Sequence, residues 1–310
     1  MPIEVIGELN NDAPIWRYLS LDKFIDLLHS QSLYFAPLSS FAKSDPFEGR
    51  LPPQVEQRLL NEALSEPNAC IREIKKELDE RLKQATAEER EHPDIKETLK
   101  TINAQNESLI SSAKATFNAF LNFRAKATSV NCWHINHYES EAMWNLYSDS
   151  GKGIAIKSSI QKLIDSVAHS KEDITLSKVH YYSDSEFNNI ELGNYKQPFK
   201  RKSFEHEKEI RLMVFNASRD WFENFLKKNN SISPNTAAEL DSKIEKFQEA
   251  HKIKVDLGTL IEELYISPYV GEPFNTAVKS LINTYRGSVP SLQNLPNPVE
   301  SKLLNPPSIY

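Results

Sequence analysis

The sequence predicts an α+β fold, in which one compact and mainly antiparallel mixed sheet carries a long helical insertion. Two observations lead to this prediction. Short strand and helix patterns alternate over residues 14–50, 129–215 and 252–285, whereas residues 53–128 have a strongly helical composition. Glycine is scarce, with 8 residues in a chain of 310, where average usage would give about 22. We expect a single α+β domain over residues 1–310.

The first elements follow one another closely. Residues 15–19 predict a short strand, and Ser20 is a suitable N-cap for a helix with one apolar face made by Leu21, Phe24, Ile25 and Leu28. Residues 32–36 predict a second strand. A long ordered loop is then expected over residues 37–50, because turn residues surround the aromatic Phe47.

Residues 53–128 predict two or three long helices. Opposite charges lie at i,i+4 spacing, as in Glu77 and Arg81, and interruptions are expected near Pro67 and Pro93. One interpretation is a helical hairpin inserted into the sheet domain. The other is an arm that binds a protein partner or a second copy of the chain.

The remaining chain returns to mixed structure. We expect strands over residues 130–135, 153–157, 177–182, 207–215, 252–256 and 264–266. We expect helices over residues 139–147, 158–168, 258–263 and 274–285, with a second helical excursion over 219–250. The proline-rich tail at 290–310 is expected to be extended.

Composition excludes several classes of protein. The close pair Gly151 and Gly153 completes neither a dinucleotide-binding glycine fingerprint nor a P-loop. A net charge of −6 gives no chain-wide basic field for nucleic acid or for an anionic membrane. Two isolated cysteines, Cys70 and Cys132, and the lack of a long apolar run or signal-peptide pattern lead us to expect a cytoplasmic protein without membrane contact.

The most informative segment is the predicted strand over residues 207–215. Alternation places Ile210, Leu212 and Val214 on an apolar face, and it places Glu207, Glu209 and Arg211 together on the opposite face. Neighbouring carboxylates raise each other's pKa, and a nearby arginine lowers it. Such a row suits a site that stabilises positive charge or accepts a proton. The alternative is an ordinary solvated strand face.

Aromatic residues gather in two further segments. Arg17 lies between Trp16 and Tyr18, where it is either a surface or cross-strand residue or a fixed donor to a phosphate or amide oxygen. A second group has helical spacing and is either core or a stacking wall for a flat ring: Met143, Trp144 and Tyr147.

Two other patterns are less specific. Cys132, His134 and His137 resemble part of a metal-ligand set, but no second cluster completes it, and we expect no metal. Tyr195 and Phe199 accompany a basic run that is either a solvated loop or a site for a phosphate-rich ligand, namely Lys196, Lys200, Arg201 and Lys202.

Several phrases in order resemble the bacterial domain-of-unknown-function family 2971. They are the segments 16–21, 33–35, 45–49, 132–134, 143–148, 153–156 and 207–212. The name of that family implies no activity.

A weaker resemblance is to ADP-ribosyltransferase-like folds. It rests on the order of a strand arginine, an aromatic strand ending in two serines, and a late Glu-x-Glu. It implies that NAD is the substrate, with Arg17 seating NAD, Glu209 bonding the ribose and Glu207 assisting. It also implies a nucleotide pocket formed by Tyr18, Tyr34, Ser39, Ser40, Trp144, Tyr147 and Arg211. The Ser-Thr-Ser triplet of those folds is absent here, since Phe41 follows Ser40.

Three functions follow as hypotheses. The first is an NAD-dependent ADP-ribosyltransferase or NAD glycohydrolase, acting as a toxin or in antiviral defence, with an unidentified protein or nucleic-acid acceptor. The second is a metal-dependent nuclease that uses Asp45, Glu48, Glu207 and Glu209. The third is a non-catalytic sensor or adaptor that binds a protein partner through the helical insertion.

Overall fold

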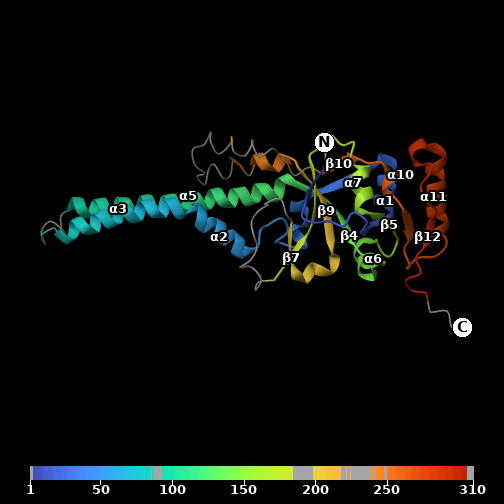
Figure 1. Ribbon diagram of the computed structural model, residues 1–310, viewed down its shortest axis with the longest axis horizontal. Coiled ribbons are helices and arrows are strands. Elements are labelled where there is room, and N and C mark those ends of the chain that lie inside the picture. The colour runs from blue at the N-terminus through green and yellow to red at the C-terminus, as the bar shows by residue number, and fades with distance from the viewer. Residues whose placement is uncertain are drawn as a thin grey trace.

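The computed structural model describes residues 3–84, 86, 93–183, 198–217, 221, 224, 239–240, 242–247 and 250–305. The predicted α+β class is confirmed, since a large sheet with mostly antiparallel pairs is combined with helices (Figure 1). Its main path runs β1 (Glu4–Ile6), β6 (Ile174–Lys178), β9 (Glu209–Phe215), β4 (Thr128–Ile135), β2 (Pro14–Ser20), β5 (Gly153–Ser159), β11 (Glu263–Ile266) and β12 (Pro298–Glu300). The pairs at its two ends, β1 with β6 and β11 with β12, are parallel.

The sheet forks at β4. One end of β4 pairs with β2 at Ile135 and His134, and the other end pairs with β3 (Ser32–Pro37) at Val130 and Ser129. Strand β3 continues away from β4 and pairs with β10 (His251–Lys254). Among the described residues, the stretch 131–133 of β4 pairs only with β9. The strands β2 and β3 therefore diverge and leave a gap in the sheet, which we call the fork.

Helices cover both faces of the sheet. The larger core lies on the face that carries Ile210, Leu212 and Val214, and α1 (Leu21–Ser30), α7 (Ile160–Ser166), α10 (Leu257–Leu260) and α11 (Phe274–Ser288) pack there. On the other face, α6 (Glu141–Tyr147) buries Met143 and Trp144 against β2. The predicted apolar face of the late strand is thus a core face.

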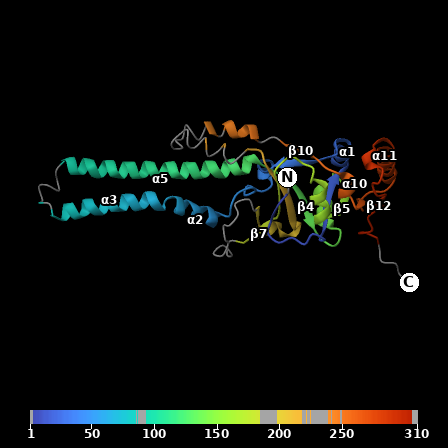
Figure 2. The same cartoon turned by 45° about the horizontal axis from the view of Figure 1, so that its top comes forward.

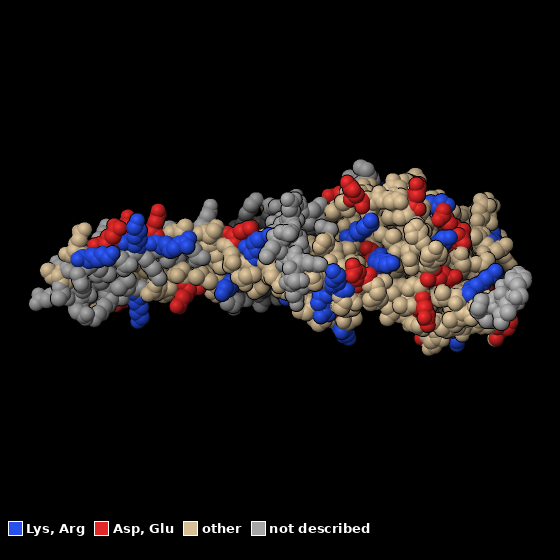
Figure 3. All heavy atoms as spheres, turned by 60° about the horizontal axis from the view of Figure 1, so that its bottom comes forward, with Lys and Arg blue, Asp and Glu red and all other residues tan. Residues whose placement is uncertain are grey.

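The range predicted as a helical insertion forms a long hairpin. Its helices are α2 (Pro53–Ala63), α3 (Ser65–Gln84) and α5 (Pro93–Ala127), and the α3–α5 part extends away from the sheet (Figure 2). In α5, the buried hydrophobic residues among those described lie in the last turns: Ala119, Leu121, Phe123 and Ala127. Val55 of α2 is also buried and packs with Leu121. Acidic and basic side chains are interspersed along the hairpin (Figure 3).

Several predicted boundaries are wrong for local reasons. Residues 38–43 of the expected loop form a 3₁₀ helix, η1 (Leu38–Lys43). The strand expected over 177–182 is two strands, β6 and β7 (His180–Tyr182), and β7 pairs with β8 (Phe199–Arg201) in a separate two-stranded sheet. The break expected near Pro67 lies at Leu64, because proline is tolerated in the first turn of α3.

The late strand begins two residues after the expected position. Residues 202–207 form the 3₁₀ helix η3 (Lys202–Glu207), and Lys208 then adopts a left-handed conformation with φ 44°. Glu207 is therefore not on the strand with Glu209 and Arg211. The prediction of three charged residues in one strand row is wrong, because a turn intervenes.

The C-terminal part is more structured than an extended tail. Residues 290–292 form a short 3₁₀ helix, η5 (Pro290–Leu292), and β12 adds a parallel strand beside β11. The structure does not describe residues 306–310 or most of the second helical excursion predicted over 219–250. Within that excursion, residues 242–244 are helical and η4 (Glu245–Phe247) is a 3₁₀ helix. None of the helices described is both long enough and apolar enough to cross a membrane.

Candidate functional site

A cavity of about 850 Å³ opens at the fork. Its walls come from β2, α1, β3, the loop after η1, β4, the end of α6, β8, η3 and β9. Because the sheet is open here, the cavity receives side chains from both faces. Arg17 shares its face of β2 with the core residues Ile15 and Leu19, whereas Glu209 points from the opposite face of β9. The volume lies within the range of about 300–1,000 Å³ that is typical of ligand sites.

One end of the cavity holds a buried cluster of charged side chains. Arg211 donates to Glu48 at 2.6 Å and to Glu209 at 2.7 Å. Lys200 donates to Glu207 at 2.6 Å, and its Nζ lies 3.6 Å from Glu209 and 3.9 Å from Glu48. Glu209 is 3% exposed and Arg211 is 2% exposed. The charged face of β9 is therefore buried, and not a solvated strand face.

The two glutamates of the Glu-x-Glu motif have opposite pKa shifts. Burial, together with the hydrogen bond and negative charge of Glu209, raises the pKa of Glu207 to about 7. Burial also acts to raise the pKa of Glu209, but the adjacent Arg211 and Lys200 outweigh it and hold that pKa well below its ordinary value. Two carboxyl groups with separated pKa values are the usual arrangement of a proton acceptor beside a permanent anion.

Arg17 supplies a positive charge at the fork. Its Nη1 is buried and has no hydrogen-bond partner among the described residues, and its guanidinium lies 5.8 Å from the centre of the Trp133 ring. Burial lowers the pKa of Arg17 to about 10, which still leaves it charged at neutral pH. A buried donor without a partner costs free energy, so this nitrogen is suited to an oxygen atom of a ligand.

Cys132 and Tyr147 line the cavity beside Arg17. Burial raises the pKa of the Cys132 thiol to about 12, so the thiol is protonated and is a poor nucleophile. Burial and the nearby Glu209 raise the pKa of the Tyr147 hydroxyl, which stays protonated and able to donate.

The cavity brings together most of the predicted site residues. Those that line it are Arg17, Tyr18, Tyr34, Ser40, Tyr147, Glu207, Glu209 and Arg211. Ser39 is not among the lining residues, and the hydroxyl of Ser40 donates to the carbonyl of Pro37. Tyr34 lines the cavity and is about half exposed.

Trp144 does not line the cavity. Its ring is completely buried, stands edge-on to Tyr18 at 4.9 Å between centres, and donates from Nε1 to Glu139. Met143 and Trp144 therefore pack in the core, whereas Tyr147 forms part of the cavity wall. Tyr147 reaches the cavity and Trp144 does not, because Tyr147 is the last residue of α6.

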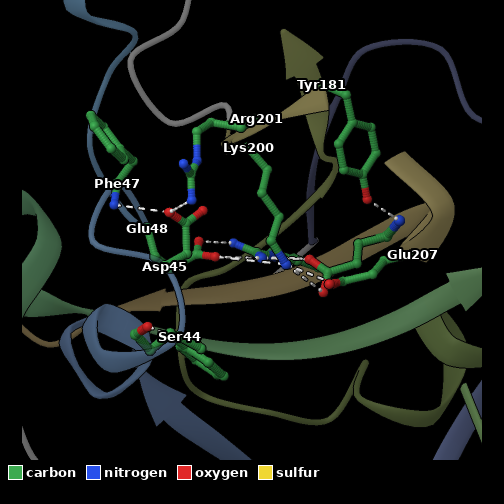
Figure 4. Close-up of polar contacts among 11 residues, drawn as sticks. Ser44, Asp45, Phe47, Glu48, Tyr181, Lys200, Arg201 and Glu207 are labelled. Atoms are coloured by element: carbon green, nitrogen blue, oxygen red, sulfur yellow. Dashed lines mark hydrogen bonds and ion pairs between the residues drawn. The ribbon is translucent and has the colours of Figure 1, made fainter. Parts of the chain in front are cut away.

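Two lining residues, Glu48 and Lys200, are absent from the pocket that the ADP-ribosyltransferase resemblance implies, although other hypotheses name them. Glu48 reaches Arg211 from the loop after η1, and Lys200 belongs to the basic run that was expected to be a solvated or phosphate-binding loop. Arg201 of the same run pairs with Asp45 at 2.8 Å and lies against Phe47 (Figure 4). Lys196 and Tyr195 lie outside the described residues. The nuclease hypothesis names Glu48, but nothing in the loop sequence indicates that Glu48 pairs with Arg211.

The three residues of the partial metal-ligand pattern do not lie together. Cys132 and His134 share a face of β4 and line the cavity, while His137 is exposed in the following bend. Within the parts of the chain that the structure describes, no three His, Cys, Asp or Glu side chains are placed to hold a metal ion. The carboxylates named for a nuclease each contact a cation: Asp45 with Arg201, Glu48 and Glu209 with Arg211, and Glu207 with Lys200.

Comparison with family models gives one match. Residues 143–212 match a family described as protein of unknown function (DUF2971). The resemblance to that family is confirmed over this region, which begins in α6 and ends in β9. The DUF2971 region includes Tyr147, Lys200, Glu207, Glu209 and Arg211, and thus one side of the cavity. No curated protein and no solved structure matches the chain, so the ADP-ribosyltransferase resemblance stays a prediction.

Proposed function

We propose that the chain is an enzyme of the ADP-ribosyltransferase type, which cleaves the bond between nicotinamide and ribose in NAD. The observation that carries the proposal is the convergence of Arg17, Tyr147 and Glu209 on one cavity. These residues come from β2, α6 and β9, and they supply a free cationic donor, an aromatic ring and a buried carboxylate. The group transferred would go to water or to a protein or nucleic-acid acceptor.

The electrostatics of the cavity suit this chemistry. As the bond between C1′ of the ribose and nicotinamide breaks, its electron pair returns to the ring nitrogen and positive charge develops on the ribose. Glu209 stays ionised and is placed to stabilise that charge. The oxygen of the attacking group then bonds to C1′, and its proton passes to Glu207, whose raised pKa makes it an effective acceptor at neutral pH.

Arg17 and Tyr147 serve binding in this proposal. The partnerless Nη1 of Arg17 would donate to a phosphate or amide oxygen of NAD. The ring of Tyr147 would form one wall for the nicotinamide. The absence of a glycine-rich phosphate loop agrees with a site of this kind, because side chains on strands replace backbone amides as the ligand donors.

The test is the release of nicotinamide from NAD by the purified chain, followed by chromatography. We expect release by the wild type, a loss of at least about 100-fold in Glu209→Gln, and little change in Glu205→Gln, because Glu205 is exposed beside the site. Melting temperatures of the three proteins check that they are folded. No release and no transfer to lysate protein or nucleic acid by a folded wild type would refute the proposal.

The same variants separate an enzyme from an adaptor. If the biological effect of the chain in cells survives Glu209→Gln but is lost when charges on the hairpin over residues 72–83 are reversed, binding through the hairpin and not catalysis explains the effect. A toxic or antiviral effect that disappears with Glu209→Gln supports the enzymatic proposal.

A further inference from the structure

His134 lies directly opposite Glu209 in the β4–β9 pair and lines the cavity, yet the proposed chemistry assigns it no role. Its Nδ1 lies 2.7 Å from the main-chain oxygen of Glu207. A carbonyl oxygen only accepts, so Nδ1 carries the hydrogen and donates it. Nε2 is therefore unprotonated in the neutral ring.

The bond from His134 holds an unusual piece of backbone. Lys208, between the two glutamates, has a left-handed conformation, which costs a residue other than glycine roughly 1–2 kcal/mol. This turn is what places the carboxyl group of Glu207, which is not on β9, beside that of Glu209. Within the turn, the amide of Lys208 donates to the carbonyl of Glu205. Three contacts from outside it add to this: His134 donates to the carbonyl of Glu207, the amide of Ile135 donates to the carbonyl of Lys208, and the amide of Glu209 donates to the hydroxyl of Tyr181.

The surroundings of His134 favour the neutral ring. Tyr18 and Tyr147 lie against it, with ring centres at 6.1 and 5.4 Å. Burial lowers the pKa of His134, and the positive charges of Lys200 and Arg17 act in the same direction, against the opposing effects of Glu209 and the bond to Glu207. A ring that resists protonation is a poor proton acceptor but a constant hydrogen-bond donor.

We propose that His134 is a positioning residue, which acts through the main chain of Glu207 to set that carboxyl group beside Glu209. The inference rests on the proposed function for its effect on turnover. It assigns His134 no contact with substrate and no transfer of a proton. The side chain serves as a fixed donor, and any side chain that keeps a donor at the position of Nδ1 should replace it.

Two substitutions separate this role from the others. In His134→Asn, the side-chain amide can donate from the position of Nδ1, but nothing replaces Nε2. In His134→Leu, the volume is similar and the donor is lost. We expect His134→Asn to keep kcat for nicotinamide release within about threefold and His134→Leu to lose at least about tenfold, since small misplacements of catalytic groups have effects of this size. The KM for NAD should change little in either.

Equal loss of kcat in both variants would overturn the inference, because it would indicate a role for Nε2 or for the ring itself. Unchanged kcat in His134→Leu would overturn it as well. A carbon-13 NMR titration of the Glu207 carboxyl group tests the positioning without any turnover. The pKa of Glu207 should stay raised in His134→Asn and move toward its ordinary value in His134→Leu.

The NMR titration also keeps the two proposals apart. A wild type that releases no nicotinamide refutes the proposed function, while the titration still decides whether His134 positions Glu207. If the wild type is active and the pKa of Glu207 is the same in His134→Leu as in the wild type, the positioning role is wrong and the proposed function stands.

Discussion

Replacing Arg211 with methionine is the sharpest test of the buried charge cluster. Arg211 donates to Glu48 at 2.6 and 3.3 Å and to Glu209 at 2.7 Å, and its side chain is almost completely buried. Methionine fills much of the volume but leaves both carboxylates facing an apolar group. Removing one partner of a buried ion pair costs about 3–5 kcal/mol, and we expect the free energy of unfolding to fall by this amount at pH 7.5.

The loss should depend on pH, and its sign follows from Glu209. In the wild type the folded-state pKa of Glu209 is lowered, so the ionised carboxylate stabilises the fold above the unfolded-state pKa of 4.5, and this contribution is lost as the pH falls through the folded-state value. In Arg211→Met, Lys200 alone opposes the effect of burial, so we expect the pKa of Glu209 to rise above that of the unfolded chain, and folding then favours the protonated form. The difference in stability between wild type and variant should therefore shrink between pH 7.5 and pH 4.5.

Urea unfolding followed by tryptophan fluorescence measures both effects. The matched control is Lys162→Met, which breaks a 2.8 Å ion pair with Glu262 between partly exposed side chains. Such pairs contribute about 0–1 kcal/mol. A loss below about 1 kcal/mol in Arg211→Met, or a loss that is the same at pH 4.5 and 7.5, would show that the cluster does not hold the carboxylates in the way described.

Three further predictions concern the core and the site. A Cβ on Gly153 would lie 2.4 Å from a neighbouring side-chain carbon, so Gly153→Ala should destabilise the fold by about 1–3 kcal/mol in thermal unfolding. A Cβ on Gly287 in α11 would meet no atom within 4 Å, so Gly287→Ala should stabilise the fold by up to about 1 kcal/mol in the same assay. Leu121→Ala should cost about 2–5 kcal/mol, because Leu121 is buried, while Leu109→Ala in the outer hairpin should be nearly neutral. Turnover of NAD should rise with pH through about 7 as Glu207 loses its proton, and Glu207→Gln should remove that limb of the profile.

Much of the fold could be predicted from local patterns. The strands β2, β3, β4 and β5 and the helix α1 follow from alternation, apolar spacing and the position of Ser20, because these signals are contained within each element. The boundary of β9 could not be predicted in this way. Nothing in the composition of residues 207–209 distinguishes a continuing strand from a left-handed turn, and the contacts of His134, Ile135 and Tyr181 that hold the turn come from distant parts of the chain.

In the site, too, local patterns predict some residues and long-range contacts decide the others. Glu207, Glu209 and Arg211 could be chosen from the sequence because alternating charges on one strand stand out against its apolar face. Their pairing with Glu48 and Lys200 could not. Glu48 lies 163 positions from Arg211, so no local pattern links the two. Lys200 is only seven positions from Glu207, but the turn that brings them together depends on contacts from other parts of the chain. Helical spacing places Trp144 and Tyr147 on one side of α6 and does not tell which of them is fully buried; Trp144 is in the core, whereas Tyr147, at the end of the helix, reaches the cavity.

By itself, the sequence determined the class of the fold, the helical insertion and the kinds of side chain that a site would use. The tertiary structure decided where those side chains meet. Arg17 and Glu209 lie on opposite faces of their strands, so on an unbroken sheet they would be separated by the backbone. The divergence of β2 and β3 from β4 opens the sheet between them, and this long-range pairing, which depends on strands far apart in the chain, creates the cavity they share.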